Sequence, residues 1–559
     1  MPDVVPVLSE VEGRHDERVR VAREADYHEG PGQPGPRGFW SRFAPFGVAA
    51  LLIGPSTTWL IRAGTALAGQ FTYPLDDTYI HLAIARRLIE NGVWGINATV
   101  STSASSSPLW TLLVAAAGAI GVPLDYAPLV LSLLAAIGWV AAVDALLSDA
   151  GMRPLVRGLA LMVLAVAGLV SALTVMGMEH TLHAALCLWF LMAVRRWDLA
   201  RWRTPLLVLA AVLPLVRFEA LALVFAAAVW RWRSSWRDAA AIAAAAIAPL
   251  ALFSAVSLAS GWLWLPNSVL TKLAGVGTRR PGDTFGWERL AEGWERLWEL
   301  QPLVFALLAL LVAGSLSRRL TREAVLVAVA VAAHVAIMPE SPLERYEGYL
   351  VSMVLIAVAS GLHQAIVTSW RGGTRRQDIA LAIAGLLVVI SLYPLYLHAR
   401  HVHDTLPVAM RNIAEQPRQT ARFVREVLQV PGPVVVIDIG LVAYAGGREV
   451  IDFMGLGDTA IARRHLAGTM DRAALQAHAA AAGAGVAIMS EAWMQIMLRD
   501  ARPPDGWRPI GRWTIADNVV CGDAMVTLFA TRPEVEAALR RDFQAFAATL
   551  PARVTATPR

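Results

Sequence analysis

The chain of 559 residues is 56% hydrophobic and only 17% charged, and its mean hydropathy is +0.50. A soluble globular protein carries about 25% charged residues, so this composition indicates an integral membrane protein and excludes a purely soluble enzyme. The formal net charge of +5 comes from arginines at the ends of apolar runs, without a basic stripe that alternates with aromatic residues, which excludes a nucleic-acid-binding protein.

The N-terminal segment, residues 1–43, is polar and contains glycines and prolines between Gly30 and Gly38. It lacks the short apolar region of a signal peptide. We therefore predict a disordered cytoplasmic tail.

Residues 44–400 contain the apolar runs of a predicted transmembrane domain with about 11 spans. A bilayer core requires about 20 helical residues, so the shorter runs are expected to end in loops that dip inward. The predicted spans cover residues 46–68, 127–147, 158–173, 181–194, 205–216, 220–230, 239–260, 303–316, 324–338, 349–367 and 379–397.

Arginines on alternate connections predict the orientation, because cytoplasmic loops carry an excess of positive charge. The outside connection at residues 261–301 also contains arginines, but it is longer and acidic as well. The scheme requires residues 108–120 to form a helix that lies on the outer surface of the plasma membrane, and it places the C-terminus outside. With the N-terminus in the cytoplasm, the inside connections carry Arg153, Arg157, Arg195, Arg196, Arg201, Arg203, Arg231, Arg233, Arg237, Arg318, Arg319, Arg322, Arg371, Arg375 and Arg376.

The C-terminal part, residues 404–559, reads as a separate domain. Three short apolar runs, at 433–437, 485–489 and 525–529, have the length and composition of buried strands, and alanine-rich helical stretches lie between them. The predicted fold is therefore a mostly helical polytopic membrane bundle with a small C-terminal α/β domain on the outer face.

An acidic pair, Asp76 and Asp77, directly follows the first predicted span. The next residues have the pattern of an amphipathic helix that ends at Asn91 and Gly92, and a serine-rich loop then leads to Pro108. One interpretation is structural: Asp77 caps its own helix and the helix dipole favours Asp76. The other is a catalytic base with a second acid that shares a divalent cation.

Further ionisable residues fall on the same predicted face of the membrane. Glu179 and His180 occupy a short outside turn, and Arg217 and Glu219 lie between two short apolar runs. Ionisable groups at membrane depth are usually functional, although an internal pair of Arg217 with Glu219 or Glu179 is an equally good interpretation. Lys272 and Arg345 lie in other outside connections. Together with Arg217, these two cations predict a site for an anion such as a lipid phosphate.

These features, taken in order, resemble the GT-C superfamily of polyprenyl-phosphate-dependent glycosyltransferases, and in particular the arabinofuranosyltransferase-type cell-wall enzymes of actinobacteria. The resemblance covers most of the chain. It is carried by Asp76-Asp77, Ser107-Pro108-Leu109-Trp110, Gly177-Met178-Glu179, Arg217-Phe218-Glu219, Leu265-Pro266-Asn267-Ser268 with Lys272, Arg345-Tyr346, Asp438-Ile439-Gly440, Tyr444, Ile451-Asp452, Gly455-Leu456 and Asp458.

The resemblance implies transfer of a sugar, arabinofuranose or mannose, from a polyprenyl-phosphate donor to an envelope glycan or glycolipid, with inversion. Asp76 would be the general base. The resemblance also implies that Asp77 and Glu179 orient the acceptor or hold Mg²⁺ or Mn²⁺. Cys187 and Cys521 lie far apart in sequence, so we expect no thiolate metal site. The implied phosphate-binding residues are Arg217, Lys272 and Arg345, and the implied substrate-binding residues are His81, His180, Glu219, Asn267 and Tyr346.

Two other classes of protein remain open from the sequence. A transporter or flippase of lipid-linked sugars would also contain intramembrane charges and broken apolar segments, but the chain shows no clear internal repeat. A scaffold or receptor would use Asp76 and Asp77 only as helix caps. The C-terminal domain could bind the acceptor glycan or could serve only for packing.

Overall fold

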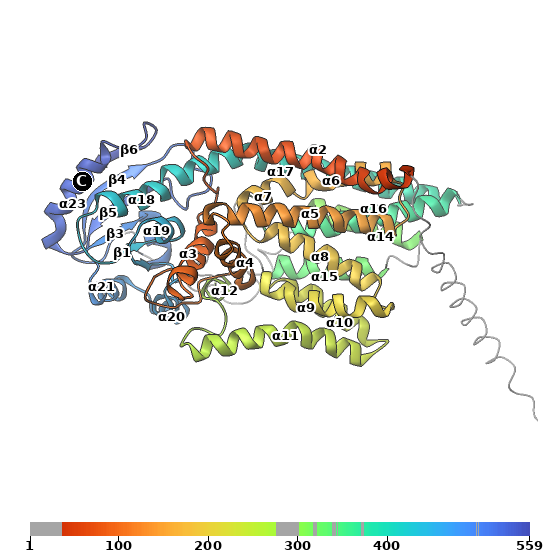
Figure 1. Ribbon diagram of the computed structural model, residues 1–559, viewed down its shortest axis with the longest axis horizontal. Coiled ribbons are helices and arrows are strands. Elements are labelled where there is room, and N and C mark those ends of the chain that lie inside the picture. The colour runs from red at the N-terminus through yellow and green to blue at the C-terminus, as the bar shows by residue number, and fades with distance from the viewer. Residues whose placement is uncertain are drawn as a thin grey trace, which may run out of the picture.

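The computed structural model describes residues 36–274, 301–316, 321–337, 343, 345–370, 374–498, 500 and 502–559. A helical bundle forms one end of an elongated molecule and a sheet domain forms the other (Figure 1). The predicted mostly helical class with a small C-terminal α/β domain is confirmed. Residues 1–35 of the predicted tail lie outside the described residues, and the rest of that tail is helical because α2 begins at Pro36.

The bundle contains helices of very different lengths. Within the described residues, four are long and apolar enough to cross a bilayer, or five if the bent pair α6–α7 forms one span. Several others have only 10–17 residues, so the count of about 11 spans stays a prediction. The bundle helices are α2 (Pro36–Ala68), α5 (Ala127–Asp149), α6 (Pro154–Ala167), α7 (Val170–Met176), α8 (His180–Arg195), α9 (Arg203–Val216), α10 (Ala220–Trp232), α11 (Trp236–Ala259), α14 (Gln301–Leu316), α15 (Thr321–Ile337), α16 (Gly348–Trp370) and α17 (Arg375–Glu415).

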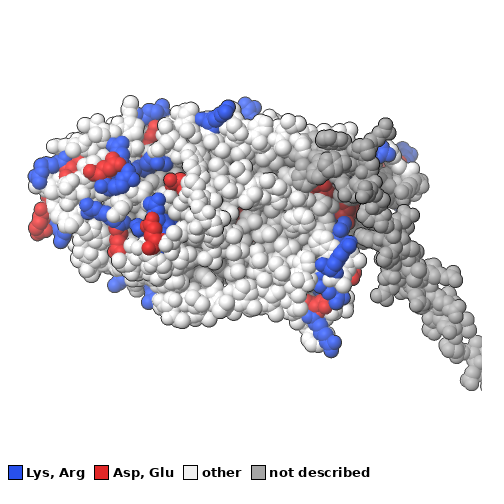
Figure 2. All heavy atoms as spheres, in the orientation of Figure 1, with Lys and Arg blue, Asp and Glu red and all other residues white. Residues whose placement is uncertain are grey.

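Charge is distributed unevenly along the surface. On the face that Figure 2 shows, charged side chains gather over the C-terminal domain and at the opposite end of the molecule, while the surface between them is mostly uncharged. An uncharged surface over helices long and apolar enough to span a bilayer is typical of a membrane domain. The chain is therefore an integral membrane protein.

The predicted span at residues 158–173 is broken in the structure. α6 and α7 meet at an angle of 48°, and Leu169 between them has φ +56°, in the left-handed region that non-glycine residues rarely adopt. The bend leads α7 to α3, where the Thr78 hydroxyl donates to the Met176 carbonyl at 2.8 Å. The break thus brings the turn that holds Glu179 next to the acidic pair.

The C-terminal domain is a six-stranded mixed sheet in the order β2-β1-β3-β5-β4-β6. β1 (Val434–Val436) is parallel to both β2 (Val450–Asp452) and β3 (Val486–Met489). β5 (Met525–Ala530), β4 (Arg508–Thr514) and β6 (Thr555–Pro558) continue the sheet in antiparallel fashion. The three predicted strands correspond to β1, β3 and β5. The helices of this domain are α18 (Pro417–Arg422), α19 (Gly440–Ala445), α20 (Thr459–Leu466), α21 (Arg472–Ala481), α22 (Glu491–Leu498) and α23 (Glu536–Ala547).

Helix α17 joins the two parts of the molecule without a break. It packs along α2 and continues to Glu415, so the domain boundary predicted at Asp404 lies inside a helix (Figure 1). Two proline positions, Pro394 and Pro407, fall within it. A continuous helix limits how far the C-terminal domain can move relative to the bundle.

Three short helices lie between the bundle and the sheet domain: α3 (Asp76–Asn91), α4 (Pro108–Ala119) and α12 (Asn267–Leu273) (Figure 1). α3 ends at Gly92, which has φ +67°, as the sequence predicts. The loop after α3 covers the free edge of the sheet, because Asn97 exchanges two hydrogen bonds of 2.9 Å with the backbone of Val450 in β2. These contacts fix α3 against the C-terminal domain.

Candidate functional site

Asp76 is bound by the C-terminal domain. α3 begins at Asp76, and no side chain caps it, so the interpretation of Asp77 as the cap of its own helix is wrong. The Asp76 carboxylate instead accepts hydrogen bonds from the backbone N–H groups of Gly440, at 2.6 Å, and Leu441, at 2.8 Å. Asp76 therefore caps α19, more than 360 residues further along the chain.

The contact between α3 and α19 requires glycine at position 440. A Cβ atom there would lie 2.0 Å from the Asp76 carbonyl oxygen and 2.9 Å from its carboxylate. We expect Gly440→Ala to displace α19, to lower the free energy of unfolding by about 1–3 kcal/mol and to lower activity. Thermal unfolding in detergent tests this, with Gly385→Ala in α17 as the control because a Cβ at Gly385 meets nothing within 4 Å. Equal unfolding temperatures for the two variants would contradict the close contact.

A third carboxyl group, Asp438, lies near the acidic pair. Asp438 follows β1, and the parallel strands β1 and β2 present their carboxyl ends at the same sheet edge. Burial raises the pKa of Asp76 far above the usual aspartate range, and Asp438 raises it further, against the lowering effect of the two N–H donors. Burial also raises the pKa of Asp438, as do Asp77 and Asp523.

The other C-terminal acids named in the resemblance serve the local fold. Asp452 is fully buried and accepts the N–H groups of Met454 at 2.9 Å and Gly457 at 2.6 Å. Asp458 caps α20. Among the C-terminal acids of that set, Asp438 is therefore the one that contributes to the site.

Asp77 pairs with a buried arginine. Its carboxylate accepts a hydrogen bond of 2.6 Å from Arg345. Burial acts to raise the pKa of Asp77, but Arg345 and Lys272 outweigh it, and the pKa lies below its usual value. The adjacent acids therefore differ: Asp77 is held ionised, whereas Asp76 binds a proton more readily.

The three predicted phosphate-binding cations converge on Tyr346. The centre of its ring lies 4.6 Å from the Arg217 guanidinium carbon, 5.1 Å from that of Arg345 and 5.7 Å from the Lys272 Nζ. The Tyr346 hydroxyl accepts from Lys272 at 3.1 Å and from Arg345 at 3.3 Å. Burial acts to raise the pKa of Tyr346, but the three cations lower it to about 8. We call these four residues the Tyr346 cluster.

Glu179 is fully buried beside this cluster. It accepts from Arg217 at 2.9 Å, and Arg217 also donates to Glu219 at 2.6 Å. Both internal ion pairs considered from the sequence are thus present. The other Glu179 oxygen lies 3.7 Å from His81 Nε2, and the remaining ring nitrogen of His81 is 2.7 Å from the Thr111 hydroxyl.

The remaining predicted residues lie on either side of the cluster. The His180 ring is tilted over Tyr346 with centroids 5.6 Å apart. Asn267 is fully buried and donates to the Thr459 hydroxyl at 3.3 Å, so it joins α12 to α20 rather than entering the cluster. Gly440 and Leu441 were not predicted as site residues, although Gly440 belongs to the Asp438-Ile439-Gly440 segment of the resemblance, because nothing local to them signals a contact with Asp76.

The predicted divalent cation has no ready ligand set. Within the described ranges, no group of three or more His, Cys, Asp or Glu side chains is arranged to hold a metal ion. Asp77 and Glu179 each face an arginine instead. In the described part of the chain, Asp77 and Glu179 therefore do not form a shared metal centre.

These features define an integral membrane protein with a buried, ion-paired site between its helical bundle and its C-terminal domain. Residues 410–530, from within α17 to the end of β5, match a family model described as "Domain of unknown function (DUF8728)". The chain matches no curated protein.

Similar solved structures include two crystal structures of ArnT from Cupriavidus metallidurans. The one bound to undecaprenyl phosphate has 13% identity and a TM-score of 0.48, and the one in the apo state has 15% identity and a TM-score of 0.47. Each likeness covers 88% of this chain and 99% of ArnT. At these TM-scores, the likeness assigns neither fold family nor activity to this chain.

Proposed function

We propose that this protein is a membrane glycosyltransferase of the GT-C type, which transfers a sugar from a polyprenyl-phosphate donor to an envelope glycan or glycolipid. The observation that carries the proposal is the convergence of Arg217, Lys272 and Arg345 on Tyr346, directly beside the Asp77–Arg345 ion pair. Cations gathered beside Asp77, with the neighbouring Asp76 carboxyl group of raised pKa, suit a reaction that expels a phosphate and removes a proton.

The proposed reaction is a single displacement. Asp76 takes the proton of the acceptor hydroxyl as that oxygen forms a bond with the anomeric carbon. The bond from the anomeric carbon to the lipid phosphate breaks on the opposite side, so the product is inverted. The leaving phosphate carries the negative charge, and cations placed in advance stabilise it without reorganisation.

Lys272 is the cation best placed to meet a phosphate. Lys272 is exposed, and its Nζ donates a hydrogen bond of 3.1 Å to the Tyr346 hydroxyl. Arg345 and Arg217 are buried and paired with carboxylates, so they fix the cluster and add N–H donors at its edge. Arginine suits this role because its planar group can serve a carboxylate and a phosphate together.

The side of the membrane and the sugar belong to the same proposal. The arginine-rich connections favour a cytoplasmic N-terminus, so the acidic pair and the C-terminal domain face outward. Two N–H groups of α19 donate hydrogen bonds to Asp76, which favours the interpretation that the C-terminal domain takes part in the site. Arabinofuranose and mannose are the sugars to test.

Analysis of the envelope glycans of a strain that lacks the gene tests the proposal. We expect a terminal sugar to be missing and the corresponding polyprenyl-phosphate sugar to accumulate, with both changes reversed by the wild-type gene. Glycans identical to those of the parent strain would contradict the proposal. Uptake of the lipid-linked sugar into vesicles without bond formation would instead indicate a transporter.

The raised pKa of Asp76 predicts the pH dependence of transfer. A general base acts when it is deprotonated, so the rate should increase as pH rises through the pKa of Asp76. Because burial and Asp438 raise this pKa, kcat/KM should still be increasing between about pH 6 and about pH 8, whereas an ordinary aspartate with a pKa of about 3.9 would give a constant rate. A flat profile over this range would contradict Asp76 as the base.

A further inference from the structure

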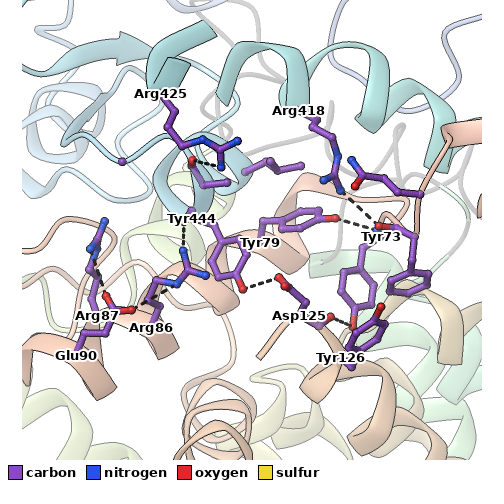
Figure 3. Close-up of a pocket in the computed structure, with 15 residues that line it drawn as sticks. Tyr73, Tyr79, Arg86, Arg87, Glu90, Asp125, Tyr126, Arg418, Arg425 and Tyr444 are labelled. Carbon is purple, nitrogen blue, oxygen red and sulfur yellow. Dashed lines mark hydrogen bonds and ion pairs between the residues drawn. The ribbon is translucent and has the colours of Figure 1, made fainter. Parts of the chain in front are cut away.

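A polar cavity lies beside α19, away from the residues of the Tyr346 cluster. Its volume is about 520 Å³, and none of the predicted site residues line it. It lies where α3, α18, α19 and the turn before α5 meet, and Figure 3 shows Arg86, Arg418, Tyr79 and Tyr444 around it. We call it the α19 cavity. Its volume lies within the range of about 300–1,000 Å³ that is usual for small-molecule sites.

The α19 cavity has an excess of positive charge. Four arginines line it, Arg86, Arg87, Arg418 and Arg425, against the two carboxyl groups of Glu90 and Asp125. Tyr73 and Tyr79 add no negative charge, because burial raises the pKa of Tyr79 to about 12 and that of Tyr73 well above its usual value. The cavity therefore attracts an anion at neutral pH.

Two of the arginines are held in place by the protein. Arg86 donates to the Tyr444 carbonyl at 2.6 Å and stacks on the Tyr444 ring with 3.9 Å to its centre. Arg418 donates to the Thr72 hydroxyl at 2.9 Å. An arginine has five N–H donors, so each keeps donors for a ligand. Groups ordered in advance lose less entropy on binding.

The other walls suit a ring with several hydroxyl groups. Phe71, Tyr73, Tyr79, Tyr126 and Tyr444 line the cavity, and aromatic rings offer an apolar face beside polar groups. Phe71 and Tyr126 adjoin the ends of α2 and α5, where a membrane helix meets the headgroup region. A ligand could therefore enter from the aqueous side or from the lipid headgroups.

We propose that the α19 cavity binds a phosphate ester of a polyhydroxylated group, supplied by a lipid headgroup or by a soluble sugar phosphate. Arg86 and Arg418 bind the phosphate, and the aromatic side chains contact the ring. This binding does not depend on the proposed transfer reaction. The two sites share α19, because Leu441 lines the cavity and its N–H group binds Asp76.

The test uses the full-length protein and two sources of the same chemistry. Calorimetry in detergent measures binding of glucose 1-phosphate against glucose. Thermal unfolding in nanodiscs compares phosphatidylinositol with phosphatidylcholine. Binding of glucose 1-phosphate indicates a soluble ligand, and stabilisation by phosphatidylinositol alone indicates a lipid headgroup. Failure of both probes would overturn the proposal.

Variants locate the bound probe. The double variant R86Q/R418Q should weaken binding at least about tenfold, as expected when charge-assisted hydrogen bonds are lost. R541Q is the matched control, since Arg541 is exposed on α23 and does not line the cavity. If the double variant does not fold, the single variant R418Q serves instead, because Arg418 is half-buried and is one of the two proposed phosphate ligands. Unchanged affinity in the cavity variant that folds would overturn the proposal.

Discussion

Replacing Asp76 with asparagine should lower the rate of sugar transfer by about 10²–10⁴-fold, the usual contribution of a general base. Asparagine has nearly the same shape, and its carbonyl oxygen can still accept one of the N–H groups that Gly440 and Leu441 direct at this position. The variant should therefore fold while it loses the proton acceptor. Transfer of labelled sugar and the unfolding temperature, measured on the same preparation, separate the two effects.

The matched control for this substitution is Asp471→Asn. Asp471 also caps a helix, since it accepts the N–H group of Ala474 at 2.7 Å, but it lies exposed on the C-terminal domain at the start of α21. It should share the small loss of stability and keep full transfer. If Asp76→Asn also keeps full transfer, Asp76 is only the cap of α19 and is not the general base.

Replacing Arg217 with glutamine should give the largest loss of stability. Arg217 is 6% exposed and binds both Glu179, which is fully buried, and Glu219. Removal of one partner of a buried ion pair typically costs about 3–5 kcal/mol, because the other charge is left without compensation. Unfolding in detergent should show this loss. Arg400→Gln, which breaks an exposed i,i+4 pair with Asp404 on α17, should cost no more than about 0.5 kcal/mol.

A second substitution separates the structural role of Arg217 from its place in the Tyr346 cluster. Glu179→Gln removes the buried charge, so the double variant R217Q/E179Q should regain part of the stability lost in R217Q. Sugar transfer should stay low in the double variant, because the cation beside Tyr346 is still missing. Recovery of both stability and transfer would show that Arg217 serves only the fold.

Local patterns predicted the elements that a few adjacent residues determine. The end of α3 at Gly92 follows from the backbone freedom of glycine, and β1, β3 and β5 are short apolar runs that become fully or largely buried. The strands β2, β4 and β6 were missed. β2 and β6 are edge strands, of which β2 has only three residues and β6 is largely exposed, and β4 carries two arginines in place of a continuous apolar run. The bend between α6 and α7 was missed because hydrophobicity continues across it.

The site was predictable where topology alone brings residues together. The predicted topology places Glu179, Arg217, Lys272 and Arg345 on one membrane face, and the structure brings them around Tyr346 or beside it. The role of α19 was not predictable. Its contact with Asp76 joins residues 364 positions apart, and the need for Gly440 comes from a packing distance that leaves no trace in the local sequence.

Transfer by the purified protein tests the central claim most directly. Wild-type protein and Asp76→Asn would be reconstituted in nanodiscs with envelope glycan and labelled polyprenyl-phosphate arabinofuranose or mannose. We expect the wild-type protein to release polyprenyl phosphate and to glycosylate the acceptor in equal amounts with one of the two donors. Asp76→Asn should do neither at a comparable rate. A wild-type protein without product from either donor, or an Asp76→Asn variant as active as the wild type, would contradict the central claim.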